Sequence, residues 1–215
     1  KVILPGLGPD HPAHAVVIYD PALLADALRQ IREAIRLAPD RAEIRLTECY
    51  VLADSGNVDG ALAAVQQVLA VLPRTTSLGS DLAGYGNELA KRGDPQGGAR
   101  LLEPVVKAFP KDATLSADYG FALAQAGRRT EASEELARSE KLAPLDTRVL
   151  RRNATAYTFL REFRSARKAW LAAAGVARDD VDRLGAASAA IVTDVALAKT
   201  ELSALATPAA SSDAK

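Results

Sequence analysis

The chain has 215 residues, and its 27 basic and 27 acidic side chains leave no net charge. Apolar residues make up 48% of it, which is enough for a core, while the charge balance argues against nucleic acid or an anionic membrane as a partner. No apolar run reaches the roughly 18–20 residues that a membrane-spanning helix needs. One cysteine excludes a disulfide framework and a multi-cysteine zinc site, and the abundant alanine favours an all-α protein.

The N-terminal segment, residues 1–19, predicts an irregular arm or a degenerate first helix, because two prolines restrict its backbone. Asp10, His11 and His14 are its candidate metal ligands. We expect them to lie in a surface loop without a metal, since catalytic zinc sites fix three ligands on rigid elements. Because the chain starts at Lys1 and contains no methionine, we expect a processed or truncated chain. Asp20 before Pro21 is a typical N-cap, and it predicts a helix over 21–37.

From residue 20 onward the sequence repeats itself. Pro39, Pro73, Pro110 and Pro144 are 34, 37 and 34 residues apart, a period typical of stacked helix pairs. We expect the three extra residues among Arg74–Leu78, as a longer turn between repeats. Further columns share the period: small residues where helices cross, large apolar residues beside them, and turn glycines. The two columns of small residues are Ala27, Ala61, Gly98, Ala132 and Ala166, and Cys49, Gly86, Gly120 and Ala154. The two columns of large residues are Ile31, Val65, Leu102, Leu136 and Trp170, and Leu52, Leu89, Leu123 and Tyr157. The turn column contains Gly56, Gly93 and Gly127.

The columns predict two helices, A and B, in each repeat. Apolar residues at steps of three and four turn one stripe of each helix inward. Glycine ends helix A in a left-handed conformation, and proline follows the end of helix B. The last repeat departs from this pattern, with Arg161 in place of the glycine and Arg178 in place of the proline. We expect about four to five helix pairs over residues 20–178.

A long helix is predicted over 179–206, capped by Asp179 and Asp180. Its apolar residues recur at alternating steps of three and four: Leu184, Ser188, Ile191, Val195, Ala198, Leu202 and Leu205. One interpretation is a capping helix with a polar outer face that closes the stack, and the other is a coiled-coil seam between two copies. We expect the cap, and a monomer rather than a dimer. Residues 207–215 predict a disordered tail.

The best-formed repeat resembles the tetratricopeptide repeat. Its matching residues are Tyr119, Gly120, Leu123, Gly127, Ala132, Leu136 and Pro144, and those of the preceding repeat are Leu82, Tyr85, Gly86, Leu89, Gly93, Gly98 and Pro110. The resemblance covers roughly Asp20–Arg178. It implies an all-α, right-handed superhelical solenoid that binds a peptide or helix in a concave groove lined by the A helices. On this alignment Tyr50, Asn87, Phe121 and Thr155 form one groove column.

A basic cluster lies between Thr147 and Lys168, where seven arginines and lysines stand against Glu162 alone. One interpretation is a solvated face, with Asp179, Asp180 and Asp182 pairing some of the second group of basic residues, from Arg161 to Lys168. The other is that Arg148, Arg151 and Arg152 anchor an acidic group of a partner at the end of the groove.

No residue pattern indicates catalysis or a cofactor. Cys49 is predicted mid-helix in a small column, where a buried, inert thiol is expected. Since both histidines lie within residues 11–14, a Cys–His or Ser–His pair is not expected. The hypothesis is a non-enzymatic protein-interaction scaffold in the cytoplasm or periplasm of a bacterium, serving envelope, pilus or secretion assembly. The alternatives are a glycan-handling segment of an exopolysaccharide export protein and a regulatory segment of a larger enzyme.

Overall fold

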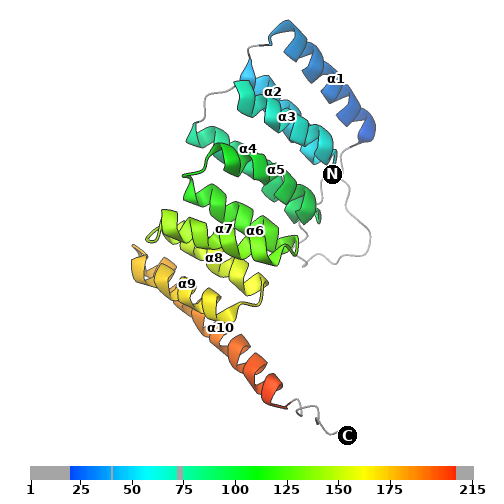
Figure 1. The fold of residues 1–215 in the computed structure, drawn as a ribbon. Helices are drawn as coiled ribbons and strands as arrows, with labels where there is room; N and C mark the ends of the chain where they lie inside the picture. Colours follow the sequence, from blue (N-terminus) through cyan, green and yellow to red (C-terminus); the bar gives the residue numbers. More distant parts are fainter. Residues whose placement is uncertain (1–19, 40, 72–74, 207–215) are drawn as a thin grey trace, which may run out of the picture. The chain divides into compact units, whose positions relative to one another are not determined.

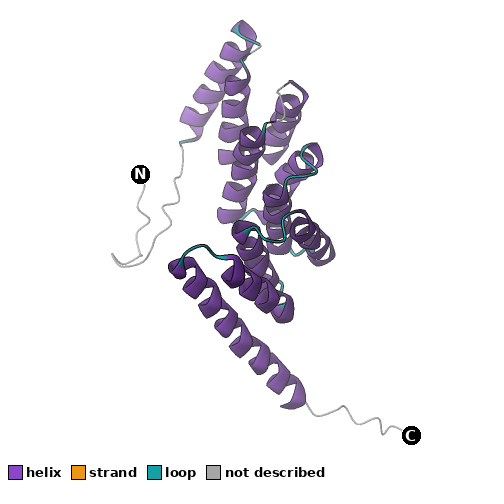
Figure 2. Cartoon of the chain, turned by 90° about the vertical axis from the view of Figure 1, so that its left-hand side faces the viewer, coloured by secondary structure: helices purple, strands orange, loops and turns teal. Residues whose placement is uncertain are grey.

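The computed structural model describes residues 20–39, 41–71 and 75–206. The predictions for residues 1–19, including Asp10, His11 and His14, and for the tail 207–215 fall outside these ranges. Within them the regular secondary structure is helical throughout (Figure 2). The chain divides into two compact units, residues 1–110 and 111–215. No helix of the described residues is both long and apolar enough to cross a membrane.

The first unit stacks two helix pairs beside a single helix (Figure 1). Helix α1 packs on α2, α2 pairs with α3, and α4 pairs with α5. The bounds are α1 Pro21–Leu37, α2 Ala42–Asp54, α3 Val58–Val71, α4 Thr76–Lys91 and α5 Pro95–Ala108. The predicted start at residue 20 is confirmed, because the Asp20 carboxylate accepts a hydrogen bond of 2.8 Å from the amide of Ala22.

The second unit continues the same pattern with two pairs and a long final helix (Figure 1). Helix α6 pairs with α7, α8 pairs with α9, and α10 packs along α9. The bounds are α6 Ala113–Gln125, α7 Arg129–Leu142, α8 Thr147–Phe159, α9 Phe163–Val176 and α10 Asp180–Ala206. The prediction of an all-α stack of helix-turn-helix repeats is confirmed.

Every turn inside a helix pair has the same backbone geometry, including the one that lacks glycine. The φ angles are 76° at Gly56, 94° at Gly93, 76° at Gly127 and 61° at Arg161. At each turn two amides bond back to the preceding helix; at the last, Arg161 N–H donates to Thr158 at 3.0 Å and Glu162 N–H to Tyr157 at 2.9 Å. This hydrogen-bond pattern is a Schellman motif, which needs a left-handed residue but not a glycine.

Replacing Arg161 with glycine is expected to raise the free energy of unfolding by about 0.5–1 kcal/mol. The left-handed conformation costs a side-chain-bearing residue about 1–2 kcal/mol, and the greater entropy of unfolded glycine offsets part of that gain. Gly127→Ala makes the reverse change at the equivalent turn and is expected to lower the free energy of unfolding. A Cβ at Gly127 would meet no atom within 4 Å, so only the backbone strain would change. Urea denaturation followed by circular dichroism measures both, and a stabilised Gly127→Ala variant would contradict the argument.

The three extra residues of the second repeat lengthen helix α4, so the prediction of a longer turn was wrong. Helix α4 has 16 residues, whereas α2, α6 and α8 have 13 each. The Thr75 hydroxyl accepts a hydrogen bond of 3.3 Å from the amide of Leu78 and so caps the added turn. Leu78 is buried, and burial of its apolar side chain stabilises the extra helical turn.

Small residues allow close contact where the paired helices cross. A Cβ built on Gly98 of α5 would lie 2.5 Å from the carbonyl oxygen of Gly86 in α4. In the second unit, a Cβ on Gly120 would lie 2.8 Å from the Leu136 side chain. Cys49 occupies the same column and is fully buried, and burial raises the pKa of its thiol to about 12. The prediction of a buried thiol is therefore confirmed, and the raised pKa disfavours the thiolate, which is the reactive form.

Helix α10 contacts α9 through small residues rather than through its predicted apolar stripe. Asp179 caps it as expected, accepting a hydrogen bond of 2.8 Å from the amide of Asp182. Ala186, Ala190 and Thr193 are buried. Members of the predicted stripe, such as Leu184 and Ile191, are instead exposed, because the alanine face lets the two helices approach more closely.

Candidate partner-binding site

The predicted site residues of the first unit, Tyr50 and Asn87, lie on the neighbouring A helices α2 and α4. Tyr50 is 42% exposed, and its ring meets that of Tyr85 edge to face, with centroids 5.7 Å apart and planes at 60°. Burial raises the pKa of Tyr85 to about 12. Asn87 is half-buried. Tyr50 is thus an exposed aromatic with one edge fixed by its neighbour.

In the second unit, Phe121 of α6 and Arg152 of α8 are in direct contact. The guanidinium carbon of Arg152 lies 5.1 Å from the centre of the Phe121 ring, a cation–π geometry. Its Nε lies 2.6 Å from a carboxylate oxygen of Asp118, which is largely buried. Two contacts therefore hold the guanidinium of Arg152 in a fixed place.

The remaining predicted residues of this unit lie on the same helix, α8. Arg151 forms an ion pair with Asp182 of α10. Arg148 is exposed, and the ion pairs found among the described residues do not include it. The Thr155 hydroxyl donates a hydrogen bond of 2.9 Å to the backbone carbonyl of Arg151, so its side chain is oriented along the helix. We name Arg148, Arg151, Arg152, Phe121 and Thr155 the basic patch.

The basic cluster of the sequence is partly neutralised, but by other pairs than those expected for Asp179, Asp180 and Asp182. Asp182 pairs with Arg151, and Arg167 pairs with Asp194 rather than with the acids at the start of α10. Asp118 was not among the residues predicted from the sequence. It precedes Arg152 by one repeat length of 34 residues, so the two occupy equivalent positions on neighbouring helices. Opposite charges at equivalent positions of consecutive repeats would therefore have indicated this ion pair from the sequence.

Two alanines of the A helices, four residues before Asn87 and Phe121, contribute little surface. Ala83 on α4 and Ala117 on α6 are buried, so these alanines pack between helices and do not line the exposed face. The reason is that small side chains allow the neighbouring helix to come close.

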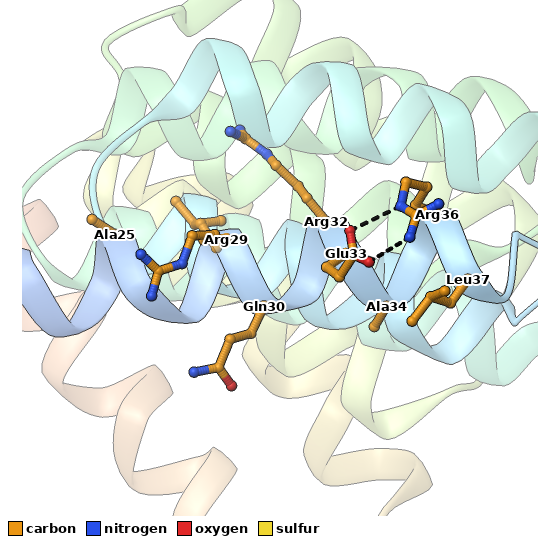
Figure 3. Close-up of a pocket in the computed structure, with 9 residues that line it drawn as sticks. Ala25, Arg29, Gln30, Arg32, Glu33, Ala34, Arg36 and Leu37 are labelled. Atoms are coloured by element: carbon orange, nitrogen blue, oxygen red, sulfur yellow. Dashed lines mark hydrogen bonds and ion pairs between the residues drawn. The ribbon is translucent and has the colours of Figure 1, made fainter.

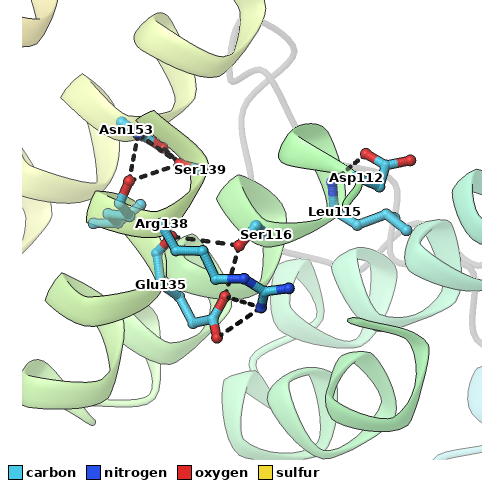
Figure 4. Close-up of polar contacts among 8 residues, drawn as sticks. Asp112, Leu115, Ser116, Glu135, Arg138, Ser139 and Asn153 are labelled. Atoms are coloured by element: carbon cyan, nitrogen blue, oxygen red, sulfur yellow. Dashed lines mark hydrogen bonds and ion pairs between the residues drawn. The ribbon is translucent and has the colours of Figure 1, made fainter. Parts of the chain in front are cut away.

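A buried polar network fixes α8, which carries the arginines of the basic patch (Figure 4). The amide nitrogen of Asn153 donates to the Ser139 hydroxyl at 2.8 Å and to the Leu136 carbonyl at 3.1 Å, both on α7. Next to it, the Glu135 carboxylate accepts from the Ser116 hydroxyl at 2.6 Å, which ties α7 to α6. These bonds set the register of three successive helices and hence the place of the patch.

Two cavities lie away from the predicted site residues. A pocket of about 980 Å³ is lined by α1, where Arg36 forms two hydrogen bonds to Glu33 (Figure 3). A cleft of about 570 Å³ lies between α7 and α9, with Tyr157 and Lys168 in its lining. Neither includes a residue of the basic patch. Over the described residues, no cluster of histidine, cysteine, aspartate and glutamate suits a metal ion.

Residues 89–151 match the tetratricopeptide repeat family model. This segment contains tetratricopeptide repeats. The matched segment includes the turns at Gly93 and Gly127 and ends at Arg151. No curated protein matches the chain in sequence.

Several solved structures are similar in fold to this repeat protein. One is YrrB, described as a tetratricopeptide repeat protein with an unusual peptide-binding site: it is 18% identical, the match covers 78% of this chain and 84% of YrrB, and the TM-score is 0.49. A MamA structure is 19% identical over 78% of this chain and 96% of its own, with a TM-score of 0.46. MamA from Desulfovibrio magneticus RS-1 is 18% identical over 71% and 85%, with a TM-score of 0.47.

Proposed function

We propose that the chain is a non-enzymatic protein-interaction scaffold whose basic patch binds an acidic segment of a partner protein. The observation that carries this proposal is the placement of Arg152, stacked on Phe121 and bonded to Asp118. A guanidinium held in place loses little side-chain entropy when it binds a carboxylate, and its planar donors match that group.

Arg148 and Arg151 extend the positive charge along the same helix. They lie four and one residues before Arg152, so Arg148 and Arg152 are one helical turn apart. Arg148 is exposed, and Arg151 shares its charge with a half-exposed aspartate. A partner with two or more carboxylates at helical or extended spacing would meet several guanidinium groups at once.

The patch favours a peptide over a glycan. Sugar binding by aromatic stacking needs an open ring face, and the guanidinium of Arg152 covers a face of Phe121. Tyr50 is exposed but lies in the other unit. An acidic peptide is therefore the ligand class that this chemistry suits best.

Charge reversal of the patch is expected to weaken binding of acidic peptides. The probes are two fluorescent peptide pools of equal length, one rich in Asp and Glu and the other with Asn and Gln in their place. Fluorescence anisotropy should show preferential binding of the acidic pool, weakened by salt. The Arg151→Glu, Arg152→Glu variant should lose about 30-fold in affinity, the equivalent of ~2 kcal/mol, with its helical content unchanged.

Two further variants separate binding from folding. Arg148→Glu breaks no ion pair found among the described residues, so a loss of affinity there reports the patch alone. Lys141→Glu with Lys168→Glu changes the charge equally but on the cleft between α7 and α9, and should leave affinity unchanged. Equal binding of both pools, or an unaffected Arg148→Glu variant, would show that the patch is not the binding site.

A further inference from the structure

Helix α10 carries an exposed apolar stripe along most of its described length. Val181, Leu184, Ile191 and Val195 are between 65% and 81% exposed, and Ser188 and Ala198 between and beyond them are exposed as well. We name these six residues the α10 seam. A terminal helix that only closes a repeat stack presents a polar outer face, whereas this one presents branched apolar side chains to water.

The seam lies on the opposite side of α10 from α9. The residues that pack on α9, Ala186, Ala190 and Thr193, are about half a helical turn away from the seam. Helix α10 has 27 residues and spans about 40 Å, whereas α9 has 14 and spans about 21 Å. Its C-terminal part therefore continues past the end of α9, as both views show (Figures 1 and 2). A further helix can lie along the seam without displacing α9.

We propose that the α10 seam pairs with the same seam of a second copy of this chain, as a parallel two-stranded coiled coil. The residues alternate in steps of three and four, as heptad positions a and d require. Val181 and Val195 occupy a positions, and Leu184 and Ile191 occupy d positions. β-Branched residues at a with leucine at d favour two strands, and Val181, Val195 and Leu184 follow that pattern, whereas Ile191 at d does not. Because the apolar stripe is continuous along one face of α10, the same stripe on a second copy can cover it.

The flanking charges set the orientation. Asp194 occupies a g position and Lys199 the e position five residues later. In a parallel pair, Asp194 lies next to the partner subunit's Lys199, which joins opposite charges twice across the two-fold axis. In an antiparallel pair centred on the same seam, Asp194 would lie opposite residue 185 of the partner, a glycine, and its pairing with Lys199 would be lost. Asp194 also pairs with Arg167 of α9, but both side chains are nearly half exposed and can share the carboxylate.

The oligomeric state of the full chain tests this proposal. Size-exclusion chromatography with light scattering, from micromolar to about a hundred micromolar protein, should give twice the 22.6 kDa chain mass at the upper end. Leu184→Glu with Ile191→Glu should return the mass to that of one chain, with the circular dichroism spectrum of the monomer retained. The matched control, Leu145→Glu with Leu171→Glu, removes two exposed leucines elsewhere in the same unit and should remain a dimer.

Cysteine cross-linking tests the orientation and does not depend on the charged variants. Val181→Cys places a thiol at an a position at one end of the seam, where a parallel pair brings the two sulfurs within disulfide reach and an antiparallel pair keeps them far apart. Mild oxidation should give a covalent dimer, whereas Arg183→Cys, off the seam, should not. A monomer at the highest concentration, or a dimer that survives Leu184→Glu with Ile191→Glu, would overturn the proposal. A dimer that cross-links no better through Val181→Cys than through Arg183→Cys would overturn the parallel register.

Discussion

Gly98→Ala is expected to lower the free energy of unfolding by about 1–3 kcal/mol, although alanine is the better helix former. The new methyl group would lie 2.5 Å from the carbonyl oxygen of Gly86 and 3.3 Å from the Cβ of Ala90. Because the first neighbour is backbone, α4 and α5 must separate to make room, and overpacking of this kind outweighs the propensity gain of about 1 kcal/mol.

Gly84→Ala is the matched control, because it makes the same chemical change in a helix of the same pair. A Cβ at Gly84 would meet no atom within 4 Å. The substitution is therefore expected to stabilise the chain by about 0.5–1 kcal/mol through helix propensity alone. Urea denaturation of both variants gives the comparison. If the two substitutions changed stability in the same direction, the close approach of α4 and α5 could not be what makes glycine necessary at position 98.

Asn153→Ala is expected to cost about 2–4 kcal/mol in the second unit. The Asn153 side chain is fully buried, and its amide bonds to the Ser139 hydroxyl and the Leu136 carbonyl. Truncation removes both bonds, deprives the buried Ser139 of a partner and leaves a cavity beside α7.

A double-mutant cycle with Ser139→Ala separates the hydrogen bond from the cavity. Ser139 also donates to the Leu136 carbonyl at 2.8 Å, so the single Ser139→Ala change should cost about 1 kcal/mol. The two substitutions should couple by roughly 0.5–3 kcal/mol, since residues in one network are not additive. Thermal and urea denaturation supply the four stabilities, and strict additivity would rule out the network as the main contribution of Asn153.

The repeat could be predicted from sequence because its determinants are local. Asp20 with Pro21 specifies a helix start through one side-chain bond and one fixed φ angle, and the turn glycines specify helix ends in the same way. The position of the three-residue insertion was predicted correctly, but it lengthens helix α4 and not the turn before it. A longer turn and a longer helix use the same residues, and only burial of Leu78, which depends on the neighbouring helix, decides between them.

The final helix illustrates what periodicity cannot decide. Both the alanine face and the apolar stripe of α10 recur at helical spacing, so the sequence identified the stripe but not which face meets α9. Close approach of small residues decided that contact. In the same way, Arg151 and Arg152 could be predicted as surface arginines, whereas their carboxylate partners Asp182 and Asp118 come from other helices.

The left-handed Arg161 gives the stack an uneven distribution of local stability. In a linear array each repeat contacts only its neighbours, so the total free energy is close to a sum of local contributions and interface contributions. A strained turn lowers the local contribution of the α8–α9 pair and makes that repeat the more easily opened of the two in its unit. Since α8 also carries the basic patch, a partner bound there would protect the repeat against fraying, and occupancy would be coupled to local order.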